Sequence, residues 1–127
     1  MKRHALMLLV LAVAAASCGK DHGSQPAPFD FDYPPTPVDV TATAGVEQAT
    51  ISWSYPAGSR DLIEEFRLYY YVEVYDAVQL IATLTDTFYV DSRLVGNLEY
   101  CYKVSAVDTN GIEGWRSDPA CALVDTH

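Results

Sequence analysis

From Val38 onward the chain is a series of short segments in which hydrophobic and polar residues alternate. An alternation with a period of two is typical of β-strands that bury one face. Turn residues such as Pro56, Gly58 and Gly111 separate the segments. Seven or so strands at this spacing predict an all-β, two-sheet sandwich, with strands at 38–42, 49–55, 66–74, 77–84, 87–91, 100–108 and 120–125. At most one helical turn is expected, at 61–65.

The N-terminal part of the chain has a different pattern. Residues 1–17 combine the basic Lys2 and Arg3, an apolar run at 5–16 and the small Ser17. This is the pattern of a secretory signal peptide, and the run is too short for a permanent membrane-spanning helix. Residues 18–36 are rich in proline, glycine, serine and aspartate and show no sustained periodicity, which predicts an extended tether. A single domain is therefore expected at 37–127.

Cys18 follows the predicted signal peptide directly. The sequence Ala15-Ala16-Ser17-Cys18 resembles the lipobox of bacterial lipoproteins, in which the cysteine becomes the new N-terminus and carries lipid. The resemblance implies an exported protein anchored in the cell envelope by its lipid, and Gly19 favours the outer membrane. Lipoboxes prefer leucine at the position of Ala15. Two alternatives are cleavage after Ala16, which fits the A-x-A rule and would release a soluble protein, and an uncleaved anchor.

The charge balance restricts the partners of the predicted domain. The full chain contains 17 acidic and 8 basic residues, with a net charge of −9. Removal of Lys2 and Arg3 with the signal peptide takes away two positive charges and changes −9 to −11. Nucleic acids and anionic lipid headgroups require a basic surface, so neither is expected as a partner.

The segment 94–108 carries a family resemblance. A leucine lies six residues before a tyrosine, and an aromatic residue, a valine and an alanine follow at alternate positions: Leu94, Tyr100, Tyr102, Val104 and Ala106. Trp53 and the segment 63–70 match the second and third strands of the same pattern. Together these residues resemble a fibronectin type III domain over about 37–125. The resemblance implies structural roles for Trp53, Leu94 and Tyr100, the last closing the crossover between the sheets.

The pleat of the expected sheet assigns side chains to its two faces. If Tyr100, Tyr102, Val104 and Ala106 point inward, their neighbours point outward. The outward residues of the third and sixth strands then form one face with two rings and scarce positive charge: Arg67, Tyr69, Tyr71 and Lys103. This face and Trp115 in the following loop are the candidate binding surface. Alternatively, the rings cover the sheet or pack against the tether residues Phe29, Phe31 and Tyr33.

The three cysteines can be divided into a pair and a single residue. A hairpin folded about Gly111 places Cys101 opposite Cys121, because each lies ten residues from the turn. A disulfide between these two strands is expected, and Cys18 is left for lipid. A redox pair is the alternative, but no Cys-x-x-Cys motif is present.

The domain lacks the usual catalytic groups. His22 falls in the tether and His127 is the last residue, so neither can act as a base inside the sandwich. The turn at Asp108 lacks the further ligands of a calcium loop, and no metal or cofactor is expected. The expected function is non-catalytic: adhesion or interaction with an envelope protein. The alternatives are a carbohydrate-binding or spacer module, or a soluble secreted form of the domain.

Overall fold

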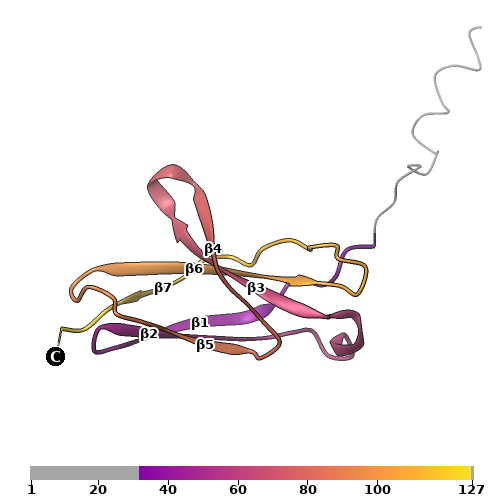
Figure 1. Ribbon diagram of the computed structural model, residues 1–127, viewed down its shortest axis with the longest axis horizontal. Coiled ribbons are helices and arrows are strands. Elements are labelled where there is room, and N and C mark those ends of the chain that lie inside the picture. Colours follow the sequence, from indigo (N-terminus) through magenta and orange to yellow (C-terminus); the bar gives the residue numbers. More distant parts are fainter. Residues whose placement is uncertain (1–31, 127) are drawn as a thin grey trace, which may run out of the picture. The chain divides into compact units, whose positions relative to one another are not determined.

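The computed structural model describes residues 32–126 (Figure 1). The predicted signal peptide, Cys18 and most of the predicted tether lie outside the described residues. The strands are β1 (Val38–Gly45), β2 (Gln48–Ser54), β3 (Glu65–Val72), β4 (Ala77–Leu84), β5 (Phe88–Ser92), β6 (Glu99–Val107) and β7 (Ala120–Leu123). Two short 3₁₀ turns, η1 (Arg60–Leu62) and η2 (Glu73–Tyr75), complete the structure. The all-β prediction is therefore confirmed.

The strands form two antiparallel sheets that pack face to face (Figure 1). One sheet has the order β1-β2-β5, and the other has the order β4-β3-β6-β7. The chain crosses from one sheet to the other after β2, β4 and β5. Strands that follow each other in sequence therefore often lie in opposite layers, and most contacts of the fold are between distant segments.

The core lies between the inner faces of the two sheets. Its members follow the predicted alternation, and they include Ala49, Ile51 and Trp53 of β2, Phe66 and Leu68 of β3, and Tyr102, Val104 and Ala106 of β6. The Trp53 ring packs edge-on against Phe66, with 5.6 Å between the ring centroids. Full burial of each large apolar side chain contributes roughly 1.5–3 kcal/mol to folding. Trp53 thus has the structural position that the sequence predicted.

Tyr100 closes the crossover from β5 to β6. Its hydroxyl oxygen accepts a hydrogen bond from the backbone N–H of Val95, with a distance of 3.0 Å. Leu94, at the start of this crossover, packs against the core. Because a half-buried ring and one hydrogen bond hold both ends of the connection, the two sheets are fixed to each other here.

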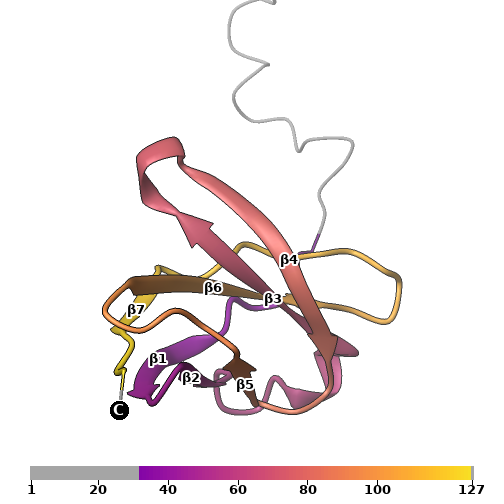
Figure 2. The ribbon, with the colours of Figure 1, turned by 60° about the vertical axis from the view of Figure 1, so that its left-hand side comes forward.

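The β3–β4 hairpin extends beyond the sandwich (Figure 2). β3 ends at Val72, two residues earlier than predicted, because the chain turns through η2 and Asp76 adopts a left-handed conformation with φ of 47°. Val74 and Tyr75 at the tip are 86% and 80% exposed. The hairpin is also irregular between Leu68 and Tyr69, where the register with β4 shifts.

The compact unit that contains the strands comprises Tyr33–His127. Pro34 and Pro37 are buried in it, so the residues just before β1 already pack against the sandwich. Within residues 32–126, no helix has the length and apolar character needed to cross a membrane.

Candidate functional site

The loop between β6 and β7 begins with a tight turn organised by Asp108. One oxygen of its carboxylate, Oδ1, accepts hydrogen bonds from the backbone N–H groups of Asn110 and Ile112, both at 2.9 Å. Gly111 has φ of +83°, a conformation that glycine adopts without steric cost. The segment is therefore an Asn-Gly turn, and the carboxylate of Asp108 is engaged by the backbone of the turn itself.

After this turn, the loop folds back along β6. Glu113 forms an isolated antiparallel bridge with Val107, and the N–H of Gly114 donates to the carbonyl oxygen of Ala106 at 2.8 Å. Further along, the hydroxyl oxygen of Ser117 accepts from the N–H of Val104 at 3.0 Å. These bonds hold the loop from Glu113 to Ser117 against the strand that precedes it.

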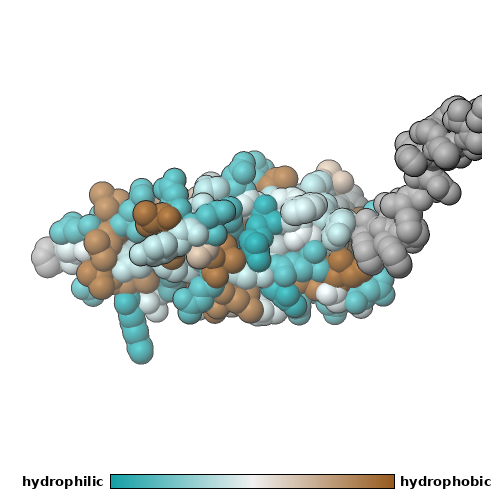
Figure 3. All heavy atoms as spheres, turned by 90° about the horizontal axis from the view of Figure 1, so that it is seen from above, coloured by the Kyte–Doolittle hydropathy of each residue, from teal (hydrophilic) through white to brown (hydrophobic). Residues whose placement is uncertain are grey.

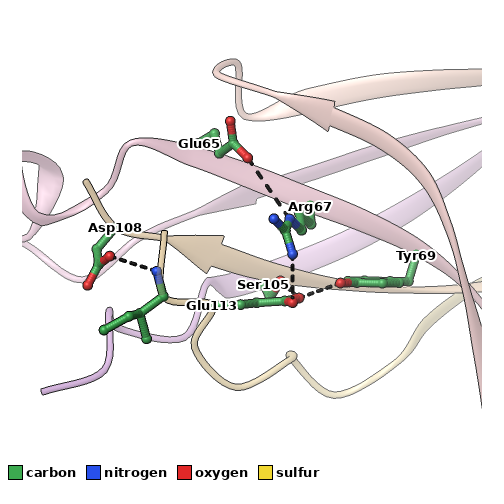
Figure 4. Close-up of polar contacts among 7 residues, drawn as sticks. Glu65, Arg67, Tyr69, Ser105, Asp108 and Glu113 are labelled. Carbon is green, nitrogen blue, oxygen red and sulfur yellow. Dashed lines mark hydrogen bonds and ion pairs between the residues drawn. The ribbon is translucent and has the colours of Figure 1, made fainter. Parts of the chain in front are cut away.

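Glu113 lies at the centre of a polar cluster on the outer face of the four-stranded sheet (Figure 4). Oε1 accepts from Nη1 of Arg67 at 3.0 Å, and Oε2 accepts from Oγ of Ser105 at 2.6 Å and from the hydroxyl of Tyr69. Arg67 is also 4.0 Å from Glu65. One loop carboxylate therefore joins β3 and β6 through three side chains.

The cluster favours the ionised form of Glu113. Partial burial raises the pKa of this carboxyl, but the hydrogen bonds from Ser105 and Tyr69 and the charges of Arg67 and Arg116 outweigh burial, so its pKa lies below the ordinary value. Burial and the hydrogen bond to Glu113 raise the pKa of Tyr69, which therefore remains a hydroxyl donor at neutral pH. Both shifts favour the same pairing of donor and acceptor.

The structure brings the four predicted outward residues together on one face. The register places Arg67 opposite Ser105, Tyr69 opposite Lys103 and Tyr71 opposite Cys101. However, Tyr69 is only 7% exposed, because the loop covers it. Figure 3 looks onto this side of the molecule and shows hydrophilic and hydrophobic residues intermixed. Arg67 and Tyr69 thus hold the loop. Tyr69 is the buried member of the pattern, and Arg67, Tyr71 and Lys103 remain partly exposed.

Two cation–π contacts complete the face. Nζ of Lys103 lies 4.3 Å from the centroid of the Tyr71 ring. The guanidinium carbon of Arg116 lies 4.6 Å from the centroid of the Tyr69 ring. Arg116 therefore covers the one ring while Lys103 covers the other, and each contact contributes about 0.5–1 kcal/mol at an exposed site.

Trp115 is the most prominent side chain of the loop. It is 71% exposed, and its ring centroid lies 6.0 Å from that of Tyr33, with the rings tilted by 46°. The neighbouring Gly114 packs so closely against Pro34 that a Cβ atom at this position would overlap the proline. A hollow of about 280 Å³ lies here, lined by Tyr33, Glu113, Gly114, Trp115 and Arg116. Of the three tether rings considered in the sequence, Tyr33 packs on Trp115, while Phe29 and Phe31 lie outside the described residues.

Sequence reasoning missed Glu113, Arg116 and Ser105 as a group. The pair Cys101 and Cys121 sets a register in which residue 115 would lie opposite residue 107. The loop instead places Glu113 opposite Val107, a shift of two residues. A two-residue shift keeps side chains on the same face, so a carboxylate replaces an indole beside Arg67. The one available signal was an acidic residue two positions after an Asn-Gly turn.

The predicted disulfide is present in the structure. Cys101 and Cys121 are bonded and lie directly opposite each other on β6 and β7, with 4.0 Å between their Cα atoms. Glu99 is close to both sulfur atoms. This is a group of the residue types that bind metals, but the two sulfur atoms are bonded to each other and provide no thiolate ligand. The cysteine pair therefore has a structural role.

No family model and no curated protein matches the sequence. Solved structures do match the fold. A Fn3-like protein from Clostridium thermocellum is 26% identical, with a TM-score of 0.58, covering 71% of this chain and 90% of that chain. The human fibronectin type III domain containing protein 3 contributes a domain that is 18% identical, with a TM-score of 0.66, covering 80% of this chain and 94% of that chain. A β-1,2-glucanase from Parabacteroides distasonis is 21% identical, with a TM-score of 0.56, covering 73% of this chain but 12% of that chain.

These likenesses and the strand orders define the class. The part of the chain that the structure describes, residues 32–126, has the fibronectin type III fold. This fold is consistent with a non-catalytic module, although one of the similar chains belongs to a glucanase. The fold alone does not determine the function of the protein, which depends on the side chains at the surface of this domain.

Proposed function

We propose that this protein is a non-catalytic recognition module of the cell envelope, exported and held by lipid on Cys18, that binds a protein partner through Trp115 and the neighbouring outer face. The observation that carries the proposal is the exposure of Trp115, at 71%, on a loop that is bonded to the sheet. Tryptophan on a protein surface is among the side chains that contribute most to binding when a partner covers it.

The support for the loop strengthens this proposal. Glu113 ties the loop to Arg67, Tyr69 and Ser105 immediately before Trp115. A side chain held in place before binding loses less conformational entropy when the complex forms. Tyr71 and Lys103 extend the surface along the same face. Because hydrophilic and hydrophobic residues are intermixed on this side of the molecule (Figure 3), the surface suits a reversible contact rather than a permanent hydrophobic interface.

The partner-binding proposal is tested by capture in the native host. Wild type, Trp115→Ala and Tyr75→Ala proteins are crosslinked in intact cells, and the captured proteins are compared. Tyr75 is the matched control, because it is an aromatic residue of similar exposure on the hairpin tip. We expect one envelope protein to be captured by wild type and Tyr75→Ala and to be lost with Trp115→Ala. Equal capture by all three proteins would contradict the proposal.

The lipid anchor is proposed from the sequence alone. The proposal rests on the apolar segment at 5–16 that precedes Cys18. It also rests on the disulfide between Cys101 and Cys121, because these are the other two of the three cysteines in the sequence. Mass spectrometry of the mature N-terminus from the native host should find a lipid on Cys18. The Cys18→Ala variant should move from the membrane fraction to the soluble fraction. A mature chain with an unmodified Cys18 would refute the anchor and would leave the recognition surface untouched.

Carbohydrate binding is a second candidate for the same surface. Tyr33 and Trp115 together line the 280 Å³ hollow, and exposed rings of this kind can stack on sugar rings. A glycan array probed with wild type and Trp115→Ala separates the two candidates. Saturable binding of one glycan that is lost in the variant would favour carbohydrate binding over a protein partner.

A further inference from the structure

A second hollow lies at the opposite side of the four-stranded sheet from the loop cluster, at the open edge of the sandwich. β4 and β5 are edge strands of different sheets, and they follow each other in the chain (Figure 2). The hollow has a volume of about 200 Å³, and it is lined by Tyr70, Gln79, Ile81, Asp91, Leu94 and Tyr100.

Asp91 places a carboxylate in this hollow. The register of β5 puts Asp91 opposite Ala49, a fully buried residue of the core, so the side chain of Asp91 points inward. Its Oδ2 accepts a 2.6 Å hydrogen bond from the hydroxyl of the buried Tyr102. Burial and this bond raise the pKa of Tyr102, which therefore stays protonated as the donor. Within residues 32–126, no lysine or arginine forms an ion pair with Asp91.

An inward carboxylate near a sheet edge has a simple structural explanation, since charges protect edge strands from pairing with other chains. Here, however, the carboxylate lies between aromatic walls. The rings of Tyr70 and Tyr100 have centroids 5.8 Å apart and are tilted by 50°, so they form a corner. Ile81 and Leu94 complete the apolar lining, and Gln79 adds one amide. The carboxylate of Asp91 therefore has apolar and aromatic neighbours and, among residues 32–126, no ion-pair partner.

This combination is selective in its chemistry. Aromatic faces and a carboxylate attract organic cations, as in the cages that bind quaternary ammonium groups. A calcium ion takes six to eight oxygen ligands. The lining of this hollow offers one carboxylate, Asp91, and one amide, Gln79. A neutral apolar ligand would cover the carboxylate without compensating its charge. The volume is below the 300–1,000 Å³ or so of sites for drug-sized molecules and suits one small headgroup.

We propose that this hollow binds a small organic ammonium group, with Asp91 as its counter-ion and Tyr70 and Tyr100 as its aromatic walls. The inference is independent of the proposed function, because it shares no residue with the surface around Trp115. The ammonium group can belong to a quaternary amine or to a lysine side chain, and both present a positive charge with an alkyl surface.

The test is a titration followed by the amide NMR spectrum of the disulfide-bonded protein. The probes are choline, its uncharged carbon isostere in which a tert-butyl group replaces trimethylammonium, and N-acetyl-lysine methylamide, at constant ionic strength. We expect saturable shifts at residues 79, 91 and 94 with at least one of the two cations and none with the isostere. The cation that binds identifies the source of the ammonium group.

Variants assign the binding to Asp91. Asp91→Asn removes the charge but keeps an oxygen that can accept from Tyr102, so the fold should be retained, and affinity for the cation should fall about tenfold or more. Asp86→Asn, in the exposed turn between β4 and β5, is the matched control and should bind as wild type does. Thermal unfolding checks that each variant folds. Equal binding of cation and isostere, or unchanged affinity in Asp91→Asn, would overturn the proposal, as would the absence of saturable shifts with every cation.

Discussion

The hydroxyl of Ser105 is fully buried, and it donates a 2.6 Å hydrogen bond to Glu113, a residue of the loop that covers it. Ser105 lies on the outer face of β6, which would face solvent if the loop were absent. The loop and the sheet are therefore one packed unit, and the position of Trp115 depends on a carboxylate two residues before it.

Replacement of Glu113 should loosen this unit. Glu113→Ala leaves the hydroxyl groups of Ser105 and Tyr69 without their acceptor, and unsatisfied polar groups in partly buried positions are costly. We expect the free energy of unfolding to fall by about 2 kcal/mol, as measured by urea denaturation. Glu64→Ala, which removes an exposed carboxylate from the neighbouring segment, should change it by less than about 0.5 kcal/mol. Similar losses in both variants would show that the cluster does not hold the loop.

The contribution of Glu113 should depend on pH. Its folded-state pKa is below the value of an unfolded glutamate, about 4.3, so the charged form stabilises the fold. This stabilisation is fully present above about pH 4.3 and is lost as the pH falls through the folded-state pKa. The difference in melting temperature between wild type and Glu113→Gln should therefore be constant near neutral pH and shrink below about pH 4. A difference in melting temperature that grows as the pH falls would contradict this prediction.

The disulfide should stabilise the domain substantially. The bond joins residues 20 positions apart, and closing a loop of this size in the unfolded chain is worth roughly 3 kcal/mol. The double variant Cys101→Ala, Cys121→Ala should unfold at correspondingly lower urea concentrations. Reduced wild type should match the double variant. If both cysteines are alkylated in the native protein without a reductant, the bond is absent in solution.

The hydroxyl of Tyr100 can be tested apart from its ring. Tyr100→Phe removes the acceptor for the N–H of Val95 and keeps the ring in place. Because Val95 is exposed and its N–H can bind water instead, the expected loss is about 1 kcal/mol. Tyr75→Phe removes a hydroxyl from the exposed hairpin tip and should leave the urea midpoint unchanged. If the urea midpoint of Tyr100→Phe equals that of wild type, Tyr100 stabilises the fold through its ring and not through its hydroxyl.

The sequence was sufficient for the fold because its signals are local. Alternation marks each strand, and the spacing from Leu94 to Tyr100 marks the crossover into β6. The same alternation placed Arg67, Tyr69, Tyr71 and Lys103 on one face, where the register puts them.

The alternation of residues did not predict which side chains on the outer face of the four-stranded sheet are buried. Tyr69 is covered because the loop register shifts by two residues relative to the disulfide, and such a shift has no periodic signature. The hollow around Asp91 was also missed. It depends on the distance between the edges of two sheets, which results from the twist of the whole sandwich and not from any one strand.

The contact of Tyr33 and Pro34 with the loop also has a mechanical consequence. The chain enters the domain beside Trp115 and Gly114, whereas its C-terminus lies at the other end of the sandwich (Figure 1). A pull between a partner on Trp115 and the N-terminal segment would therefore act across a short distance at one end. Little of the force would be transmitted along the strands. The contacts of the loop between β6 and β7 would therefore break before the strands of the two sheets separate.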